Sequence, residues 1–237
     1  MTLSRSTDSR PIVEAVYTHS LPSIDGKLSE SILAEAPVYR MGGLKGQEDS
    51  VDEAAWVQFA WNSEGLYVGI RCADSFIVQQ NRQDEQLHYL SGDVFELFIR
   101  PLNDSYYWEN YVTPFGNKST LFFFKSVGGK QLTDALTGHD FRQLVAGAQR
   151  DVEFEVDGQS YRGWTAEMWI PNTYMTSFEE VWGEEGEWTV HCGRYNYGED
   201  FPEEPELSMY PPLSELSFHL AEEYARLKLR APNPSAT

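Results

Sequence analysis

Glu96 is an acidic residue inside a segment that otherwise has the pattern of a buried β-strand. In SGDVFELFIRP, residues 91–101, side chains alternate between two faces, and Glu96 shares its face with Val94 and Phe98. A carboxylate between two large apolar neighbours is unfavourable unless a charged or hydrogen-bonding partner compensates its burial. Glu96 is therefore expected either to form a buried ion pair or to face a ligand.

A second carboxylate, Glu109, lies on the next predicted strand, YYWENYVT, where Tyr107, Glu109 and Tyr111 share one face. Glycosidases use two carboxylates about 5 Å apart for retention of configuration, or roughly 6.5–9.5 Å apart for inversion. Glu96 and Glu109 on adjacent strands are compatible with the shorter spacing. A glycoside hydrolase that uses this pair is therefore one alternative, although the sequence shows no cluster of carboxylates at the strand ends.

Three aspartates, Asp74, Asp84 and Asp93, flank the polar segment 75–92. Calcium prefers several oxygen ligands from carboxylates, backbone carbonyls and water. A loop with this composition is therefore a candidate calcium site, with calcium as the expected cofactor. The spacing does not match an EF-hand, and solvated loop carboxylates are the alternative interpretation.

The composition restricts the classes of partner. The net charge of −19 argues against nucleic acid, because phosphates are bound by Lys and Arg, whereas neutral ligands and cations are compatible with it. No apolar run is long enough to suggest a membrane span, and MTLSRSTDSR lacks the apolar region of a signal peptide. Cys72 and Cys192 have no zinc-type spacing and fall in predicted core strands, which favours two buried thiols, with a single disulfide as the alternative.

The elements that must hold these residues are mostly short strands. Period-two segments separated by turn signals run from IVEAVY, residues 12–17, to YARLKLR near the end of the chain. This pattern predicts an all-β, antiparallel β-sandwich in a single domain over residues 1–237, with an ordered core over about 11–230. One or two short helices are expected, before Pro37 and after Pro171. We expect Glu96 on a central strand and both termini at one end.

Seven segments in order resemble the family 9 carbohydrate-binding modules and their DOMON-like relatives. They are IDGKLSE, WNSEGLYVGIRCAD, GDVFELFIRP, YYWENYVTPFG, GWTAEMWIP, WTVHCGRYNY, and ELSMYPPLSELSFH followed by YARLKL. The resemblance implies a jelly-roll-like sandwich that is not an enzyme, often carries calcium and binds sugars between aromatic side chains. It also implies an extracellular or periplasmic location beside glycan-degrading proteins.

The resemblance also implies roles for individual residues. Glu96 matches a family carboxylate that lines the sugar site, and Tyr89 and Tyr210 fall near its aromatic walls, where the well-characterised sugar binders have Trp. Glu109 falls where those binders have a basic residue, and Arg194 in HCGRYNY is expected to supply the compensating cation. The ligand-binding set implied by the resemblance and by the shared face of the strand is Tyr89, Glu96, Tyr107, Glu109, Arg194 and Tyr210.

Three other interpretations remain open at this point. Glu96 and Arg194 could form a purely structural ion pair within the sandwich. Some DOMON-like relatives hold haem b through Met and His, and this chain has candidates for such ligands in Met168, Met209, His191 and His219. Finally, the Tyr residues that stand where the characterised sugar binders have Trp are compatible with an interaction or structural domain that has lost its sugar site.

Overall fold

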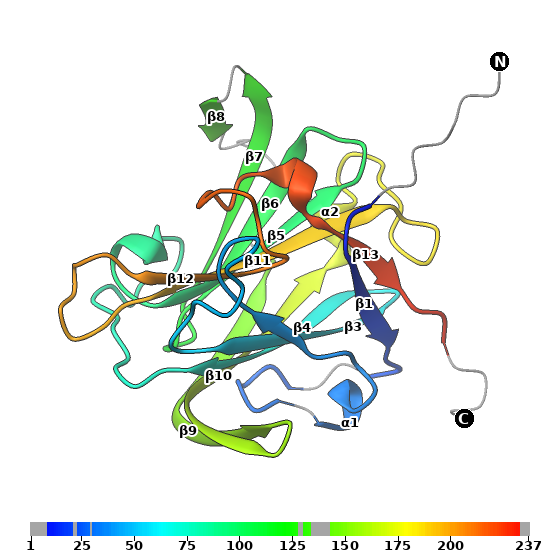
Figure 1. Cartoon of the computed structure of the whole chain (residues 1–237). Coiled ribbons are helices and arrows are strands. Elements are labelled where there is room, and N and C mark those ends of the chain that lie inside the picture. Colours follow the sequence, from blue (N-terminus) through cyan, green and yellow to red (C-terminus); the bar gives the residue numbers. More distant parts are fainter. Residues whose placement is uncertain (1–8, 21–22, 29, 128–129, 134–142, 233–237) are drawn as a thin grey trace.

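The computed structural model describes residues 9–20, 23–28, 30–127, 130–133 and 143–232, and it consists mainly of β-strands (Figure 1). Two sheets enclose one main hydrophobic core. The prediction of an all-β fold with few helices is therefore confirmed. The helices of the described residues are short: α1 (Glu30–Leu33), α2 (Asn172–Met175), and the single-turn 3-10 helices η1 (His88–Leu90) and η2 (Ala221–Glu223).

The first sheet carries Glu96 and Glu109. Its strand order is β8-β7-β6-β5-β11-β13, and β12 pairs with the second half of β11. Its strands are β5 (Val94–Pro101), β6 (Tyr106–Val112), β7 (Lys118–Val127), β8 (Lys130–Thr133), β11 (Trp188–Asn196), β12 (Glu206–Tyr210) and β13 (Ala225–Leu229). Glu96 lies on β5, which pairs with β6 on one side and β11 on the other, so its predicted central position is confirmed.

The second sheet has the order β3-β4-β10-β9, with β2 paired to the start of β3. Its strands are β2 (Tyr39–Met41), β3 (Ala55–Asn62), β4 (Gly65–Ala73), β9 (Val145–Val156) and β10 (Gln159–Pro171). These pairs are antiparallel.

Strand β1 (Ile12–Tyr17) connects the two sheets. Its first part, from Ile12 to Ala15, pairs with β13, while Val16 and Tyr17 pair with β3, and both pairings are parallel. The described strands are otherwise antiparallel. Because β1 and β13 run in the same direction, the described chain begins and ends at opposite ends of this strand pair (Figure 1). The expectation that both termini lie at one end is therefore wrong.

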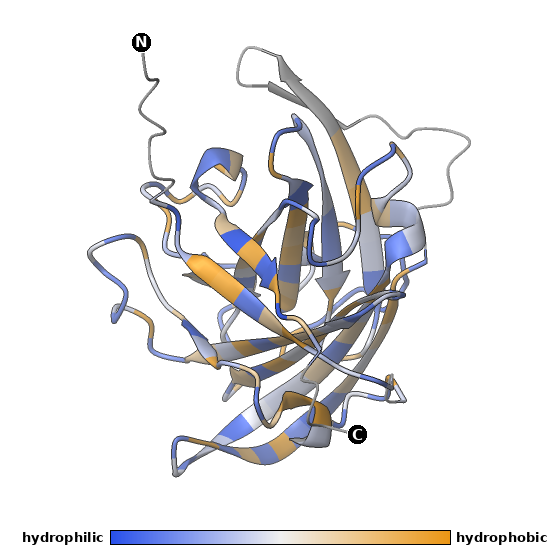
Figure 2. Ribbon diagram, turned by 90° about the vertical axis from the view of Figure 1, so that its right-hand side faces the viewer, coloured by the Kyte–Doolittle hydropathy of each residue, from blue (hydrophilic) through white to orange (hydrophobic). Residues whose placement is uncertain are grey.

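Alternation of side chains determines which residues enter the core. Hydrophilic and hydrophobic residues alternate along the strands (Figure 2), as period-two geometry requires. On β5, Phe95, Leu97 and Ile99 point into the main core between the sheets. Cys72 on β4 and Cys192 on β11 are free and buried in the same core, as the sequence favoured.

The opposite, outer face of the first sheet is partly covered by residues 211–224, which connect β12 to β13 and are called the covering segment below. A second hydrophobic cluster lies between this segment and the sheet; it includes Phe98, Tyr107, Leu213, Phe218 and Tyr224. Such a cover explains how a strand can have large apolar residues on both faces. Among the described residues, no helix is long and apolar enough to cross a membrane.

Candidate functional site

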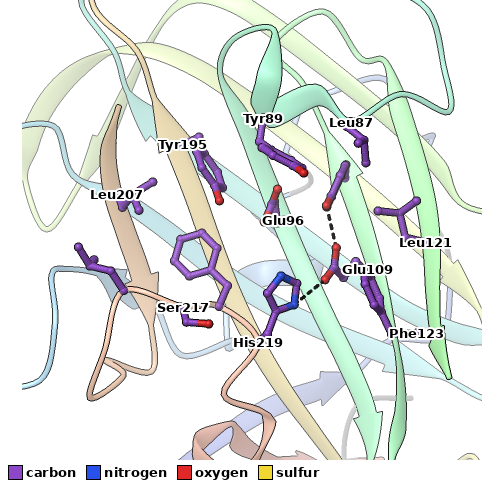
Figure 3. Close-up of a pocket in the computed structure, with 13 residues that line it drawn as sticks. Leu87, Tyr89, Glu96, Glu109, Leu121, Phe123, Tyr195, Leu207, Ser217 and His219 are labelled. Carbon is purple, nitrogen blue, oxygen red and sulfur yellow. Dashed lines mark hydrogen bonds and ion pairs between the residues drawn. The ribbon is translucent and has the colours of Figure 1, made fainter. Parts of the chain in front are cut away.

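A pocket of about 410 Å³ lies on the outer face of the first sheet, beside the covering segment (Figure 3). Three polar side chains of the sheet form its floor: Glu96 from β5, and Glu109 and Tyr111 from β6. Strand pairing places Tyr111 directly across from Glu96, and Glu109 directly across from Phe98. The two carboxylates are therefore diagonal neighbours on one face.

Glu109 has a hydrogen-bond donor on one side and a histidine within ion-pair distance on the other. The Tyr111 hydroxyl donates to its Oε2 at 2.7 Å, and Nδ1 of His219 lies 3.1 Å from its Oε1 (Figure 3). The same Nδ1 lies 2.8 Å from the Tyr107 hydroxyl. Tyr107 thus lies behind His219 and holds it, rather than lining the pocket itself.

Glu96 is less well compensated. Its side chain is buried, and its Oε1 has no hydrogen-bond partner among the described residues. Burial raises the pKa of Glu96 well above its ordinary value, and the nearby Glu109 carboxylate raises it further. A buried carboxylate oxygen without a partner is unusual in a folded protein, and this one belongs to a residue that lines the pocket.

Aromatic rings form the pocket wall on one side of the carboxylates. Tyr89, from η1, and Tyr195, on β11, are neighbours with ring centroids 5.4 Å apart. Tyr195 meets Phe218 of the covering segment edge-on, at 5.6 Å. Leu121 and Phe123 of β7 line the other side (Figure 3). Exposed leucines, Leu87 and Leu216, add apolar surface.

Gly193 makes room for this wall. It pairs with Glu96 across β5 and β11, and a Cβ atom at this position would lie 2.5 Å from two ring carbons of Phe218. Glycine therefore allows the Phe218 ring to lie against the strand beside Glu96. A glycine in the interior of a strand often marks such a close approach. In the sequence, this glycine indicates a close approach to the strand but does not identify Phe218 as the residue that approaches.

The structure brings Tyr89, Glu96 and Glu109 together, but not Arg194. Arg194 pairs with Phe95, so it points into the sandwich on the opposite face of the sheet from Glu96. The guanidinium donates to the carbonyl oxygens of Glu53 and Ala73, at 2.9 and 2.8 Å. The expectation that Arg194 compensates Glu96, in the pocket or in an ion pair, is therefore wrong.

Tyr210 is also displaced from its expected place. It pairs with Cys192 and packs on the core side of the sheet, with its ring 5.0 Å from that of Tyr39. It does not line the pocket. The wall residues that sequence reasoning missed are Tyr195, one position after Arg194 and hence on the other face, and Phe218 with His219 from the covering segment.

Each of the three predicted calcium ligands, Asp74, Asp84 and Asp93, accepts hydrogen bonds from the protein. Asp74 Oδ2 accepts a hydrogen bond from Trp164 and lies 3.3 Å from Arg194, and both oxygens of Asp93 accept backbone N–H groups. Asp84 instead accepts from the backbone N–H of Lys118. These carboxylates are committed to separate donors, and the described residues contain no group of three or more His, Cys, Asp or Glu suited to a metal.

The candidate haem ligands are likewise dispersed. Met168 lies in the main core between the sheets, whereas Met209 belongs to the cluster on the outer face. His191 is buried against Tyr224 in a stacked arrangement, and burial lowers its pKa to about 3. His219 is held by Glu109 and Tyr107. No Met and His of this set therefore face each other across the pocket.

Comparison with known proteins gives a likeness at the level of structure. No family model and no curated protein sequence matches the chain. A proposed carbohydrate-binding protein from Bacteroides uniformis superimposes with a TM-score of 0.70 at 12% identity, covering 94% of this chain and 100% of that protein.

Two structures of a family 9 carbohydrate-binding module from Caldicellulosiruptor kristjanssonii also superimpose on the chain. They are complexes with cellotriose and with glucose, each with a TM-score of 0.60 and 12% identity; they cover 95% and 94% of this chain and 97% of the module. At this identity the likeness shows the fold. The chain therefore has the fold of the family 9 carbohydrate-binding modules, as the ordered sequence segments predicted.

Proposed function

We propose that this chain is a non-catalytic carbohydrate-binding domain whose site is the pocket above Glu96 and Glu109. The observation that carries the proposal is the buried Glu96 carboxylate at the floor of a pocket with aromatic walls, where one carboxylate oxygen has no hydrogen-bond partner in the part of the chain that the structure describes. The fold shared with modules that bind cellotriose and glucose supports the same class of ligand.

The chemistry of the lining suits a sugar ring. A carboxylate can accept hydrogen bonds from two hydroxyls, and such charge-assisted bonds are the stronger kind. Tyr89, Tyr195 and Phe218 offer apolar ring surface to the C–H face of a pyranose. A ligand placed between these groups would satisfy the polar floor and cover the apolar wall at the same time.

A neighbouring pocket extends the site. It has a volume of about 460 Å³ and shares Tyr195, Leu207 and Leu216 with the first. This continuity supports a ligand longer than one sugar unit, so we expect cellotriose to bind more tightly than glucose. The family resemblance supports a role beside glycan-degrading proteins.

Binding is favoured over hydrolysis by the placement of the carboxylates. A glycosidase places its two carboxyl groups on either side of the scissile bond. Here both carboxylates project from the same face of one sheet, and Glu109 is held by Tyr111 and His219. Both groups would contact the bound sugar from below.

The test is titration calorimetry with glucose and cellotriose, after a glycan array to find the preferred saccharide. Glu96→Gln should weaken binding at least about tenfold, since a charge-assisted hydrogen bond contributes roughly 1.5–3 kcal/mol. Tyr89→Ala and Tyr195→Ala should each weaken it roughly three- to tenfold through lost stacking.

Tyr210→Ala is the matched control, because it removes a tyrosine outside the pocket and should leave the affinity unchanged. Circular dichroism checks that each variant is folded. Absence of binding to any saccharide would instead support an interaction domain without a sugar site. Release of reducing sugar from cellotriose by the wild type, abolished in Glu96→Gln, would support a hydrolase.

A further inference from the structure

The titratable groups that line the pocket are mainly acidic, and the described lining residues include no permanently charged base. Its thirteen lining residues include the two carboxylates and one histidine, but no Lys or Arg. The whole chain has a net charge of −19, which adds to the attraction of cations. The lining therefore favours a ligand that brings positive charge to the floor.

Within this pocket, Glu96 is the carboxylate that lacks a cation. The described titratable side chains that face it or interact with it electrostatically are Glu109 and Tyr111 on β6, Tyr195 on β11, Tyr197 directly after β11, Tyr89 on η1, and His219 and Tyr224 on the covering segment. The tyrosines carry no positive charge. His219 contacts Glu109 and Tyr107, not Glu96.

The aromatic wall is suited to the same kind of ligand. An organic cation over the face of Tyr or Phe is attracted by the electron-rich ring. Tyr89 and Tyr195 form such a wall next to Glu96 (Figure 3), and Phe218 meets Tyr195 edge-on. For a metal ion, by contrast, the described residues contain no group of three or more His, Cys, Asp or Glu that could hold it.

We propose that the pocket recognises a saccharide with a free amino group, whose ammonium form contacts Glu96, in preference to the corresponding neutral sugar. This inference rests on the proposed carbohydrate-binding function and specifies its ligand class. The hydroxyls of such an amino sugar would reach Glu109 and Tyr111, and its apolar face would lie on the aromatic wall.

Proton release distinguishes this mode of binding from simple hydroxyl recognition. In the empty pocket, burial and Glu109 raise the pKa of Glu96, so its protonated form persists to higher pH than that of an exposed glutamate. A bound ammonium group favours the ionised carboxylate and lowers that pKa again. At pH values between the ordinary pKa of a glutamate and the raised pKa of Glu96, binding of the ammonium form should therefore release protons from Glu96, whereas a neutral sugar should release fewer.

The experiment compares glucosamine, N-acetylglucosamine and glucose by titration calorimetry, in two buffers that differ in ionisation enthalpy. Acetylation removes the charge and keeps the ring. We expect glucosamine to bind at least about tenfold more tightly than either neutral sugar and to release protons on binding. In Glu96→Gln this preference should disappear, while Tyr210→Ala should retain it.

The possible outcomes distinguish the amino-sugar inference from the proposed carbohydrate-binding function. Equal or tighter binding of glucose or N-acetylglucosamine by the wild type would overturn the amine inference and leave carbohydrate binding intact. Failure of all saccharides to bind would overturn both. If Glu96→Gln does not fold, the comparison of the three sugars with wild-type protein, together with Glu96→Asp, decides the question.

Discussion

Glu96 combines a cost to stability with a candidate role in binding. An ionised carboxylate in a buried position is unfavourable, and the second carboxylate nearby makes ionisation harder still. Residues that are costly to the folded state and available to a ligand are typical of binding and catalytic sites. The cost at this residue can be measured independently of any ligand.

Glu96→Gln should change the pH dependence of stability. Because the folded-state pKa of Glu96 is raised, its favourable contribution is fully present below the unfolded-state value near 4.5 and is lost as pH rises through the folded-state pKa. Glutamine has no charge to bury. The melting temperature of the variant should therefore increasingly exceed that of wild type as pH rises, and the two curves should converge in acid.

The measurement is a series of thermal melts followed by circular dichroism from acid to mildly alkaline pH. Glu184→Gln, which changes an exposed residue outside the pocket, is the control and should follow the wild-type curve. A Glu96→Gln protein that is less stable than wild type at every pH would contradict the prediction. It would show that the carboxylate makes a stabilising bond.

At the scale of single elements, the pocket depends on the contact between β11 and the covering segment. Gly193→Ala places a methyl group where the Phe218 ring lies, so the ring must move away from the strand. We expect sugar affinity to fall several-fold while the fold is retained. Chemical-shift changes in the Phe218 ring, together with calorimetry, would detect the displacement.

Gly198→Ala serves as the matched control, since a Cβ there meets no atom within 4 Å. It should bind like wild type. Unchanged affinity in Gly193→Ala would mean that Phe218 does not contribute a wall to the site.

Strand alternation and strand pairing also explain what the sequence could and could not predict. Alternation alone predicted β1 at its observed bounds and placed Glu96 on a buried strand. It could not decide which residues of β11 share a face of the sheet with Glu96, because that depends on the pairing register between segments distant in the chain. The expected register brought Arg194 to Glu96, whereas the observed register brings Gly193 there.

Some pocket-wall residues were not predicted for the same reason, because their positions depend on contacts between distant segments. Phe218 and His219 lie in a connection without strand periodicity, and only packing against a distant sheet reveals their role. Tyr210 was placed at a wall by its resemblance to family positions, but its pairing with Cys192 turns it to the core. Tyr89 was placed at the site by its resemblance to a family position, and Glu109 by strand alternation and by its place on the strand next to Glu96.

At the scale of the whole molecule, Arg194 and Asp74 connect the two sheets. Arg194 projects from β11 in the first sheet and bonds to the carbonyl of Ala73 at the end of β4 in the second. Burial raises the pKa of Asp74, and Arg194 acts against this effect by favouring the charged form. Removing the cation alone leaves a buried carboxylate without a counter-charge.

Arg194→Met should therefore lower the free energy of unfolding by about 3–5 kcal/mol, as measured by urea denaturation. The double variant Arg194→Met/Asp74→Asn removes both charges and should recover part of that loss. Equal stability of the single and double variants would show that the pair does not couple the sheets. Saccharide affinity of the folded variants should stay at the wild-type level, since Arg194 lies outside the pocket.

In the covering segment, the residues that anchor it to the fold differ from the residues that line the pocket. In sugar-binding surfaces, fold stability and ligand choice often depend on the same residues. Leu213 and Tyr224 are fully buried and anchor the segment, and the Tyr224 hydroxyl donates to the carbonyl of Phe218 at 2.6 Å. Leu216, Ser217 and His219 lie between these anchors, line the pocket and belong to no sheet. Randomising these three positions in a display library would alter ligand choice while the acidic floor and the strand pairing stay constant, which makes this connection the natural starting point for evolving new glycan specificities.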